Sequence, residues 1–274
     1  MTRKIATIIG IGGGFFVATL LISGFGAWFV RQKGLVYEPE GSFDLWYLVF
    51  LFLLATAMVL LLLRVAHGRI IFSTFFSLAM FVGIWFIADI FLPETVAIFA
   101  AAMFIIIRYL FPRVFIQNIL VVLGIAGIAV SIGLSVPWFT LLVLAVILAV
   151  YDIIAVYGTK HMITMMRGLL AQGVIFALVI PERVSWLGAR LAQAKPGEGY
   201  LLIGTGDIAL PAMVVASLLP FGFGMALGAG IGAFAGFLLT MWLFLFPGQG
   251  KPMPALPPIV LGLALGTLIS FLIQ

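Results

Sequence analysis

The sequence predicts an all-α membrane protein with nine transmembrane helices. Three observations predict it: 65% of the 274 residues are apolar, only 8% are charged, and the apolar residues fall into nine long segments. A soluble domain of this size does not have such a composition. Each apolar segment is near the roughly 20 residues that a membrane-spanning helix requires.

The nine segments follow one another along a single membrane domain, residues 1–274. They cover residues 5–30, 43–63, 70–92, 95–111, 114–135, 138–157, 200–219, 221–246 and 254–273. The first segment follows Arg3 and Lys4, as the apolar part of a signal peptide would. Its apolar stretch is longer than that of a signal peptide and lacks a small-residue cleavage site, so we interpret it as a retained span.

One long connection, residues 158–199, joins the sixth segment to the seventh. Its residues 161–180 are apolar with scattered polar residues, which favours an amphipathic helix in the membrane interface. Residues 181–196 contain two prolines and several charges, and we predict a mobile segment there. Counting residues 161–180 as a tenth span would move Asp207 to the opposite depth of the membrane, and we reject that alternative.

Basic residues gather in alternate connections, which predicts the orientation. Those on one side are Arg3, Lys4, Arg64, Arg69, Arg108, Arg113, Lys160, Arg167, Arg183, Arg190, Lys195 and Lys251. Only Arg31 and Lys33 fall on the other side. By the positive-inside rule the N-terminus is cytoplasmic, the C-terminus is outside and the connection 158–199 is a cytoplasmic loop. We therefore interpret the basic excess as membrane topology and expect no nucleic-acid partner.

Asp152 and Asp207 lie inside the sixth and seventh segments. An acid near the membrane centre costs about 2.5 to 3.5 kcal/mol on insertion scales, so it indicates a function and needs a partner. The two segments run in opposite directions, and both acids lie roughly 8 to 10 Å below the cytoplasmic surface at the helical rise per residue. Each aspartate is therefore the expected partner of the other.

Short motifs accompany these acids on the sixth, seventh and ninth segments. They are Tyr151-Asp152, Gly204-Thr205-Gly206-Asp207 and Pro254-Ala255-Leu256. In order, spacing and placement they resemble the presenilin and signal peptide peptidase family of intramembrane aspartyl proteases, which implies the presenilin-like arrangement of nine helices. The run 206–211 is more similar to the signal peptide peptidase branch, whereas the predicted orientation fits presenilins, so the substrate orientation stays open.

The resemblance implies that Asp152 and Asp207 are the catalytic residues of an aspartic endopeptidase. Two carboxyl groups a few Å apart hold one proton between them. The ionised group can take a proton from water while the protonated group polarises the scissile carbonyl. The expected substrate is a transmembrane or signal-type helix in the lipid bilayer, and this chemistry requires no metal or cofactor.

Substrate-binding residues follow from the need to unwind such a helix. The released backbone groups of the substrate must find new partners, and an extended segment can pair with exposed protein backbone. Glycine permits close approach, and proline leaves carbonyls without a helical partner. The predicted substrate-binding residues are Tyr151, Gly204, Gly206, Pro254, Ala255 and Leu256.

Other chemistries fit less well. The chain has no cysteine, and its two histidines, His67 and His161, fall in predicted cytoplasmic connections, too shallow for a serine intramembrane protease. The helical His-Glu-x-x-His motif of zinc proteases is absent from the sequence. A proton-coupled transporter that uses both acids as a relay and an ion leak channel remain alternatives. Compact loops favour a prokaryotic plasma membrane, and the oligomeric state stays open.

Three further sets of residues receive structural interpretations. The glycines at positions 224, 228, 232 and 236 recur every four residues and predict close helix packing, as do those at 262 and 266. Gln117 and Asn118 are expected to form interhelical hydrogen bonds. Asp89, near the outer end of its segment, is expected in the membrane interface.

Overall fold

Nine α-helices of 14 residues or more occur in the part of the chain that the computed structural model describes, residues 2–34, 45–62, 68–159, 165–166, 168–170, 173–245 and 253–273. Each lies on one of the predicted segments. They are α1 (Thr2–Gln32), α2 (Leu45–Leu62), α3 (Gly68–Asp89), α4 (Glu94–Leu110), α5 (Val114–Ser135), α6 (Trp138–Ile153), α8 (Thr205–Leu218), α9 (Phe223–Leu245) and α10 (Leu256–Ile273).

Six helices in the described ranges are long and apolar enough to cross a membrane. They are α1, α3, α5, α9, α10, and α6 together with the π-helical turn η1 (Ile154–Gly158) that continues it. Helices α2 and α8 are apolar but shorter, and α4 has 17 residues. Six such helices fit a multi-pass membrane protein, whereas the crossing of the bilayer by all nine remains a prediction.

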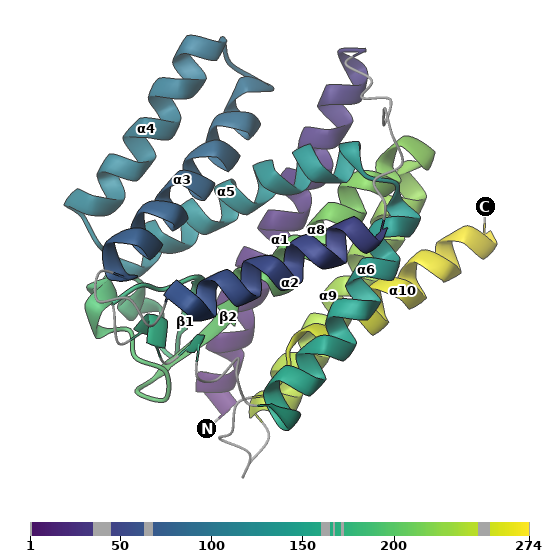
Figure 1. Ribbon diagram of the computed structural model, residues 1–274. Coiled ribbons are helices and arrows are strands. Elements are labelled where there is room, and N and C mark those ends of the chain that lie inside the picture. Colours follow the sequence, from purple (N-terminus) through teal and green to yellow (C-terminus); the bar gives the residue numbers. More distant parts are fainter. Residues whose placement is uncertain are drawn as a thin grey trace.

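Helix α8 lies between the two sides of the bundle. Figure 1 shows α3 and α4 on one side and α6, α9 and α10 on the other. Helix α5 packs against α3, α1 and α8, while α8 also packs against α9 and α6. Most residues of α8 are buried, from Asp207 to Leu218. From Asp207 onward, α8 is therefore largely enclosed by other helices, whereas Gly206 in its first turn is exposed.

A two-stranded antiparallel sheet replaces helix that the sequence predicted. Strand β1 (Ala177–Pro181) pairs with β2 (Tyr200–Gly204), with Ala177 opposite Gly204. The predicted span 200–219 was therefore wrong over its first five residues. The predicted interfacial helix 161–180 is helical at 165–166 and 168–170 and was wrong from residue 173 onward. An apolar run of five residues is too short for periodicity to separate strand from helix. Residues 160–164, 167 and 171–172 lie outside the described residues.

The predicted mobile segment, residues 181–196, is folded against the start of α5. It contains two short 3-10 helices, η2 (Val184–Gly188) and η3 (Leu191–Gln193). The Val114 N–H donates to the Ala189 carbonyl at 3.1 Å, and the Leu191 N–H donates to the Pro112 carbonyl at 2.7 Å. This connection therefore has a defined conformation, and the prediction of a mobile segment there was wrong.

Glycines on α9 allow α10 to approach closely, as predicted. A Cβ added at Gly232 would collide with the Gly262 carbonyl oxygen, and one at Gly236 would collide with the Pro258 carbonyl oxygen. Small residues permit this backbone contact in membrane helices. Because the contact includes the first turn of α10, it fixes where that helix begins.

The two basic residues on the predicted outer side bind the ends of helices. Arg31 donates to the Leu219 carbonyl, just after α8, and Lys33 donates to the Ile90 carbonyl, just after α3. Cations are favourable at the unpaired carbonyls of helix C-termini. At the other end, Lys4 pairs with Glu182, the residue that follows β1. Figure 1 shows the N-terminal part of α1 passing close to the β-sheet. Arg64, Lys160, Arg167, Lys251 and both histidines lie outside the described residues.

Candidate active site

Asp152 lies near the end of α6 and is held by the start of α10. Its side chain is buried, and the Leu256 N–H donates to its Oδ2 atom at 3.3 Å. Leu256 is the first residue of α10, so its N–H has no partner within the helix and is available to a side chain. The ninth predicted segment therefore reaches Asp152 through a backbone group. The π-helical turn η1 begins directly after this site.

Asp207 is the third residue of α8, and its carboxylate turns back on the residue that caps the helix. Gly204 is the N-cap, and its backbone group hydrogen-bonds to Asp207. This is one half of a capping box, in which an acid at the third position accepts from the N-cap N–H. A Cβ added at Gly204 would lie only 3.1 Å from Oδ2 of Asp207. Gly204 therefore leaves the space that the carboxylate fills.

The two acids lie on helices that pack against each other. Asp152 is on α6, and α6 contacts α8, which carries Asp207. Both side chains are less than one tenth exposed. The one ion pair among the described residues joins Lys4 to Glu182, so in that part of the chain neither carboxylate is paired with a cation. Two buried acids without a cation can lower their repulsion by sharing one proton.

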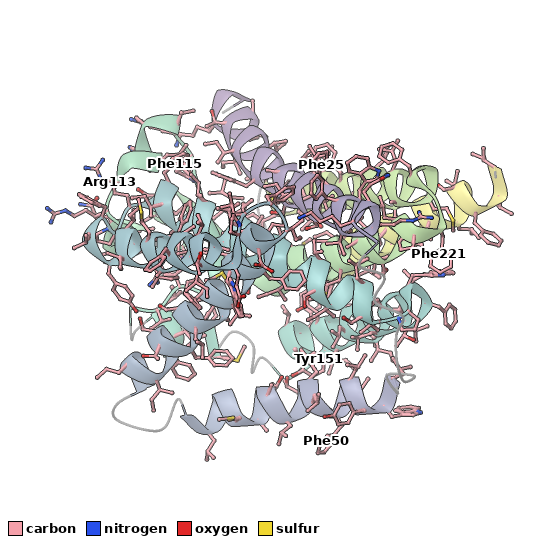
Figure 2. All side chains as sticks on the ribbon, turned by 90° about the horizontal axis from the view of Figure 1, so that it is seen from above. Phe25, Phe50, Arg113, Phe115, Tyr151 and Phe221 are labelled. Carbon is pink, nitrogen blue, oxygen red and sulfur yellow. The ribbon has the colours of Figure 1, made fainter. Side chains whose placement is uncertain are left out.

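Tyr151 points away from α8, toward α2. Its ring meets Phe52 of α2 edge-on, with centroids 5.2 Å apart, and its hydroxyl bonds to Thr56. Figure 2 shows Tyr151 on the side of α6 that faces α2. Tyr151 therefore joins α6 to α2, although the sequence predicted it as a substrate-binding residue.

The Pro254-Ala255-Leu256 motif lies against α9 and Asp152. Pro254 and Leu256 are buried, and the Ala255 carbonyl accepts from the Thr240 hydroxyl at 3.2 Å. We expected unpaired carbonyls here for a substrate. The Ala255 carbonyl is instead paired with Thr240, and the Leu256 N–H binds Asp152.

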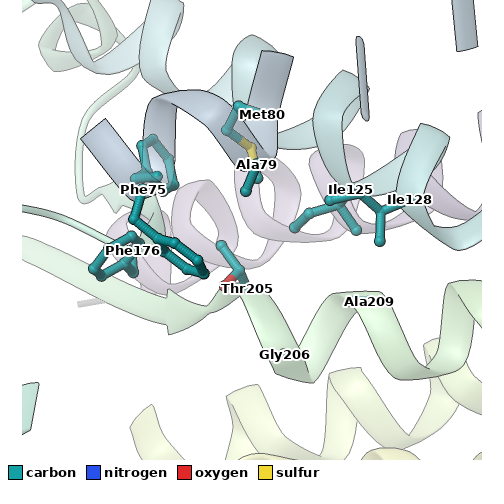
Figure 3. A pocket seen from close by; sticks show the side chains of 10 residues that line it. Phe75, Ala79, Met80, Ile125, Ile128, Phe176, Thr205, Gly206 and Ala209 are labelled. Atoms are coloured by element: carbon teal, nitrogen blue, oxygen red, sulfur yellow. The ribbon is translucent and has the colours of Figure 1, made fainter. Parts of the chain in front are cut away.

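An apolar cavity of about 210 Å³ lies on the opposite side of the α8 start, between α3, α5 and α8. Figure 3 shows Thr205 and Gly206 at its edge, below Met80 and Ile125. A Cβ added at Gly206 would meet no atom within 4 Å. Packing within this chain therefore does not require glycine at position 206.

Gln117 forms an interhelical hydrogen bond as the sequence predicted, because its Oε1 atom accepts from Nε of Arg108 on α4 at 2.8 Å, whereas Asn118 binds strand β1. Both side chains are fully buried at the start of α5 and bind the backbone of residues 175–179. The signal that could have located them is two adjacent amides in the first turn of an otherwise apolar segment, since amides there can pair with a nearby extended chain.

The chain is similar to one known protein family and to solved structures of that family. A family model described as signal-peptide peptidase, presenilin aspartyl protease matches residues 33–274. Two solved structures of a presenilin family intramembrane aspartate protease are similar. The one in space group C222 has 23% identity and a TM-score of 0.66, covering 96% of both chains. The one in space group P2 has 26% identity and a TM-score of 0.65, covering 94% of this chain and 97% of that chain. No curated protein matches.

Proposed function

We propose, on the premise that this chain belongs to the signal-peptide peptidase and presenilin family of aspartyl proteases, that Asp152 and Asp207 are its catalytic dyad. Membership makes the chain an integral membrane protein and an aspartic endopeptidase. The observation that carries the assignment is the pair of buried acids on two helices that pack against each other.

The proposed reaction is hydrolysis of a peptide bond by water. One carboxyl group is ionised and the other holds the shared proton. The ionised group takes a proton from water as the water oxygen bonds to the scissile carbonyl carbon, and the protonated group donates to the carbonyl oxygen. When the C–N bond breaks, the leaving nitrogen receives a proton from the dyad. No covalent bond to the enzyme forms.

Strand β2 supplies an edge on which an unwound substrate can pair. The Asn118 side chain forms hydrogen bonds with both the N–H and the C=O of Val179, so these two groups point away from β2. The backbone groups of Leu178 and Ile180, one residue to either side, point toward β2. In an antiparallel pair the groups of every second residue face outward. Those of Leu202 therefore point toward the other edge of β2. We propose that a substrate segment adds there as a strand, leading its scissile bond to Asp207.

The cavity beside Gly206 is proposed to hold an apolar side chain of the substrate. Its walls include Phe76, Met80 and Ile125, so an apolar side chain is favoured there. The open space at Gly206 lets the substrate backbone approach the start of α8. Together with β2, this placement fits a single-span or signal-type helix that has unwound locally.

The proposed orientation places the site toward the cytoplasmic side of a prokaryotic plasma membrane. Lys4 and Glu182 pair beside the sheet, so the N-terminus of α1 and the loop that precedes Asp207 lie at the same end. Basic residues prefer the cytoplasmic side. The N-terminus is therefore proposed to be cytoplasmic and the C-terminus external.

The protease assignment is tested with the purified protein in liposomes that contain a model membrane helix. We expect fragments whose masses give a cut within the membrane, and inhibition by a transition-state mimic of aspartyl proteases. Proton-coupled uptake of a solute without any cleavage would contradict the proposal in favour of a transporter. Ion conductance without cleavage would contradict it in favour of a channel.

Alanine at the two glycines of the motif is expected to separate binding from chemistry. Gly206→Ala should keep the melting temperature, because the added methyl meets no atom within 4 Å, but should raise KM by blocking the substrate backbone. Gly204→Ala should lower kcat by about tenfold, because its methyl displaces the Asp207 carboxylate. Michaelis kinetics and thermal melts of the purified variants measure both effects.

Gly10→Ala is the matched control, because a Cβ at this α1 glycine also meets no atom within 4 Å. It should leave both kinetic constants unchanged. An unchanged KM in Gly206→Ala would remove Gly206 from the substrate path. An unchanged kcat in Gly204→Ala would show that the acid tolerates the methyl group.

A further inference from the structure

Asn118 binds strand β1 as a neighbouring strand would. Its Nδ2 atom donates to the Val179 carbonyl at 2.7 Å, and the Val179 N–H donates to its Oδ1 atom at 2.8 Å. A residue in an antiparallel strand exchanges the same two bonds with its opposite residue. Asn118 is fully buried, so water does not compete for either bond.

Gln117 continues this pairing along the same edge. Its Nε2 atom donates to the Ile175 carbonyl at 3.0 Å, and its Oε1 atom accepts from Nε of Arg108 at 2.8 Å. Arg108 is buried with its guanidinium group 4.9 Å from the centre of the Phe76 ring. Within the described residues it forms no ion pair. The amide of Gln117 is therefore held in place from the other side.

Strand β1 is connected to the candidate catalytic residue Asp207 through β2 and the start of α8. Strand β1 pairs with β2, and β2 runs without a break into the N-cap of α8 at Gly204. The Thr205 N–H also donates to the Phe176 carbonyl at 3.4 Å, which ties the first residue of α8 to the chain just before β1. A displacement of β1 from α5 would therefore displace the cap that binds Asp207.

We propose that Gln117 and Asn118 act as a surrogate strand that closes the outer edge of β1 and thereby positions Asp207 for hydrolysis. They are positioning residues and do not touch the substrate. The inference rests on the proposed catalytic role of Asp207. It also explains how a two-stranded sheet, which is marginal by itself, is formed without a third strand. Because Asn118 bonds the outward-facing backbone groups of β1 at Val179, a substrate strand would pair with the outer edge of β2.

The test is Asn118→Leu, which keeps a similar volume and removes both bonds to Val179. We expect hydrogen exchange of the amides in 177–181 and 201–204 to accelerate by about tenfold or more, while the helices α9 and α10 keep their protection. We expect kcat to fall by about tenfold to a hundredfold, with a smaller change in KM, because a small misplacement of a reacting group has that effect.

Ser135→Ala is the matched control on the same helix, since the Ser135 hydroxyl donates to the Ser131 carbonyl of its own helix. It should change neither quantity. If Asn118→Leu does not fold, Asn118→Ser is measured instead, with the same direction and a smaller effect. A normal kcat overturns the inference, whatever the exchange rates. So does a reduced kcat with unchanged protection of the sheet.

The failure of this inference is distinguishable from the failure of the proposed function. If the wild-type protein cleaves the model helix and Asp207→Ala does not, the dyad stands, and the Asn118 variants alone decide the positioning role. If Asp207→Ala cleaves normally, the proposed function fails and the positioning role fails with it.

Discussion

Replacement of either Asp152 or Asp207 by alanine is expected to abolish cleavage of a membrane helix. Removing a general acid or base costs about 10²- to 10⁴-fold, and both acids act on the same proton, so either change should remove most of the activity. The fold should survive. An acid inside the membrane costs about 2.5 to 3.5 kcal/mol on insertion scales, so its removal does not take away a stabilising contribution of that size.

The measurement is the initial rate of cleavage in liposomes, together with a thermal melt of each variant. Asp152→Asn and Asp207→Asn keep the side-chain shape but cannot hold or release the shared proton, and they should be as inactive as the alanine variants. Asp89→Ala is the matched control, because Asp89 is an exposed acid at the end of α3. A dyad variant that keeps one tenth of the wild-type rate would contradict the assignment.

Leu256→Pro is expected to lower kcat by about tenfold to a hundredfold. Proline has no N–H, so Asp152 loses the bond that Leu256 donates to its Oδ2 atom. A hydrogen bond to a charged group contributes about 1.5 to 3 kcal/mol, and each 1.4 kcal/mol is a factor of ten in rate. Leu256 is the first residue of α10, a position at which helices accept proline.

Leu256→Ala separates this effect from the loss of the buried side chain. It keeps the N–H but removes packing from the small cluster around Leu148 and Val260, so it should lower the melting temperature and leave kcat within a few fold. Michaelis kinetics and melts of both variants decide the matter. Equal kcat values in the two variants would mean that the backbone N–H does not position Asp152.

The sequence predicted the helices well because hydropathy acts over long segments. Each of the nine predicted segments overlaps one of the described helices, and residues 114–135 coincide with α5 at both ends. The prediction was wrong where the backbone conformation depends on neighbouring segments and not on hydropathy. Tyr200–Gly204 is as apolar as the helix that follows, and it is a strand because β1 lies beside it.

The candidate site could be predicted in part. Asp152 and Asp207 stand out because acids are costly in an apolar segment, and the motifs around them support the family resemblance. The bond from Leu256 to Asp152 and the pairing of Asn118 with Val179 could not be found in the same way. These partners are 104 and 61 residues apart in the sequence, and local periodicity cannot predict a contact over such a separation.

Composition and hydropathy alone determined that this chain is a membrane protein and which of its acids fall in apolar segments, because the transfer of a side chain into hydrocarbon depends on its own chemistry. Only the tertiary structure decided which backbone groups meet those acids and which apolar segments become strands. Hydrogen bonds are short and directional, and their partners are fixed only when distant segments have packed.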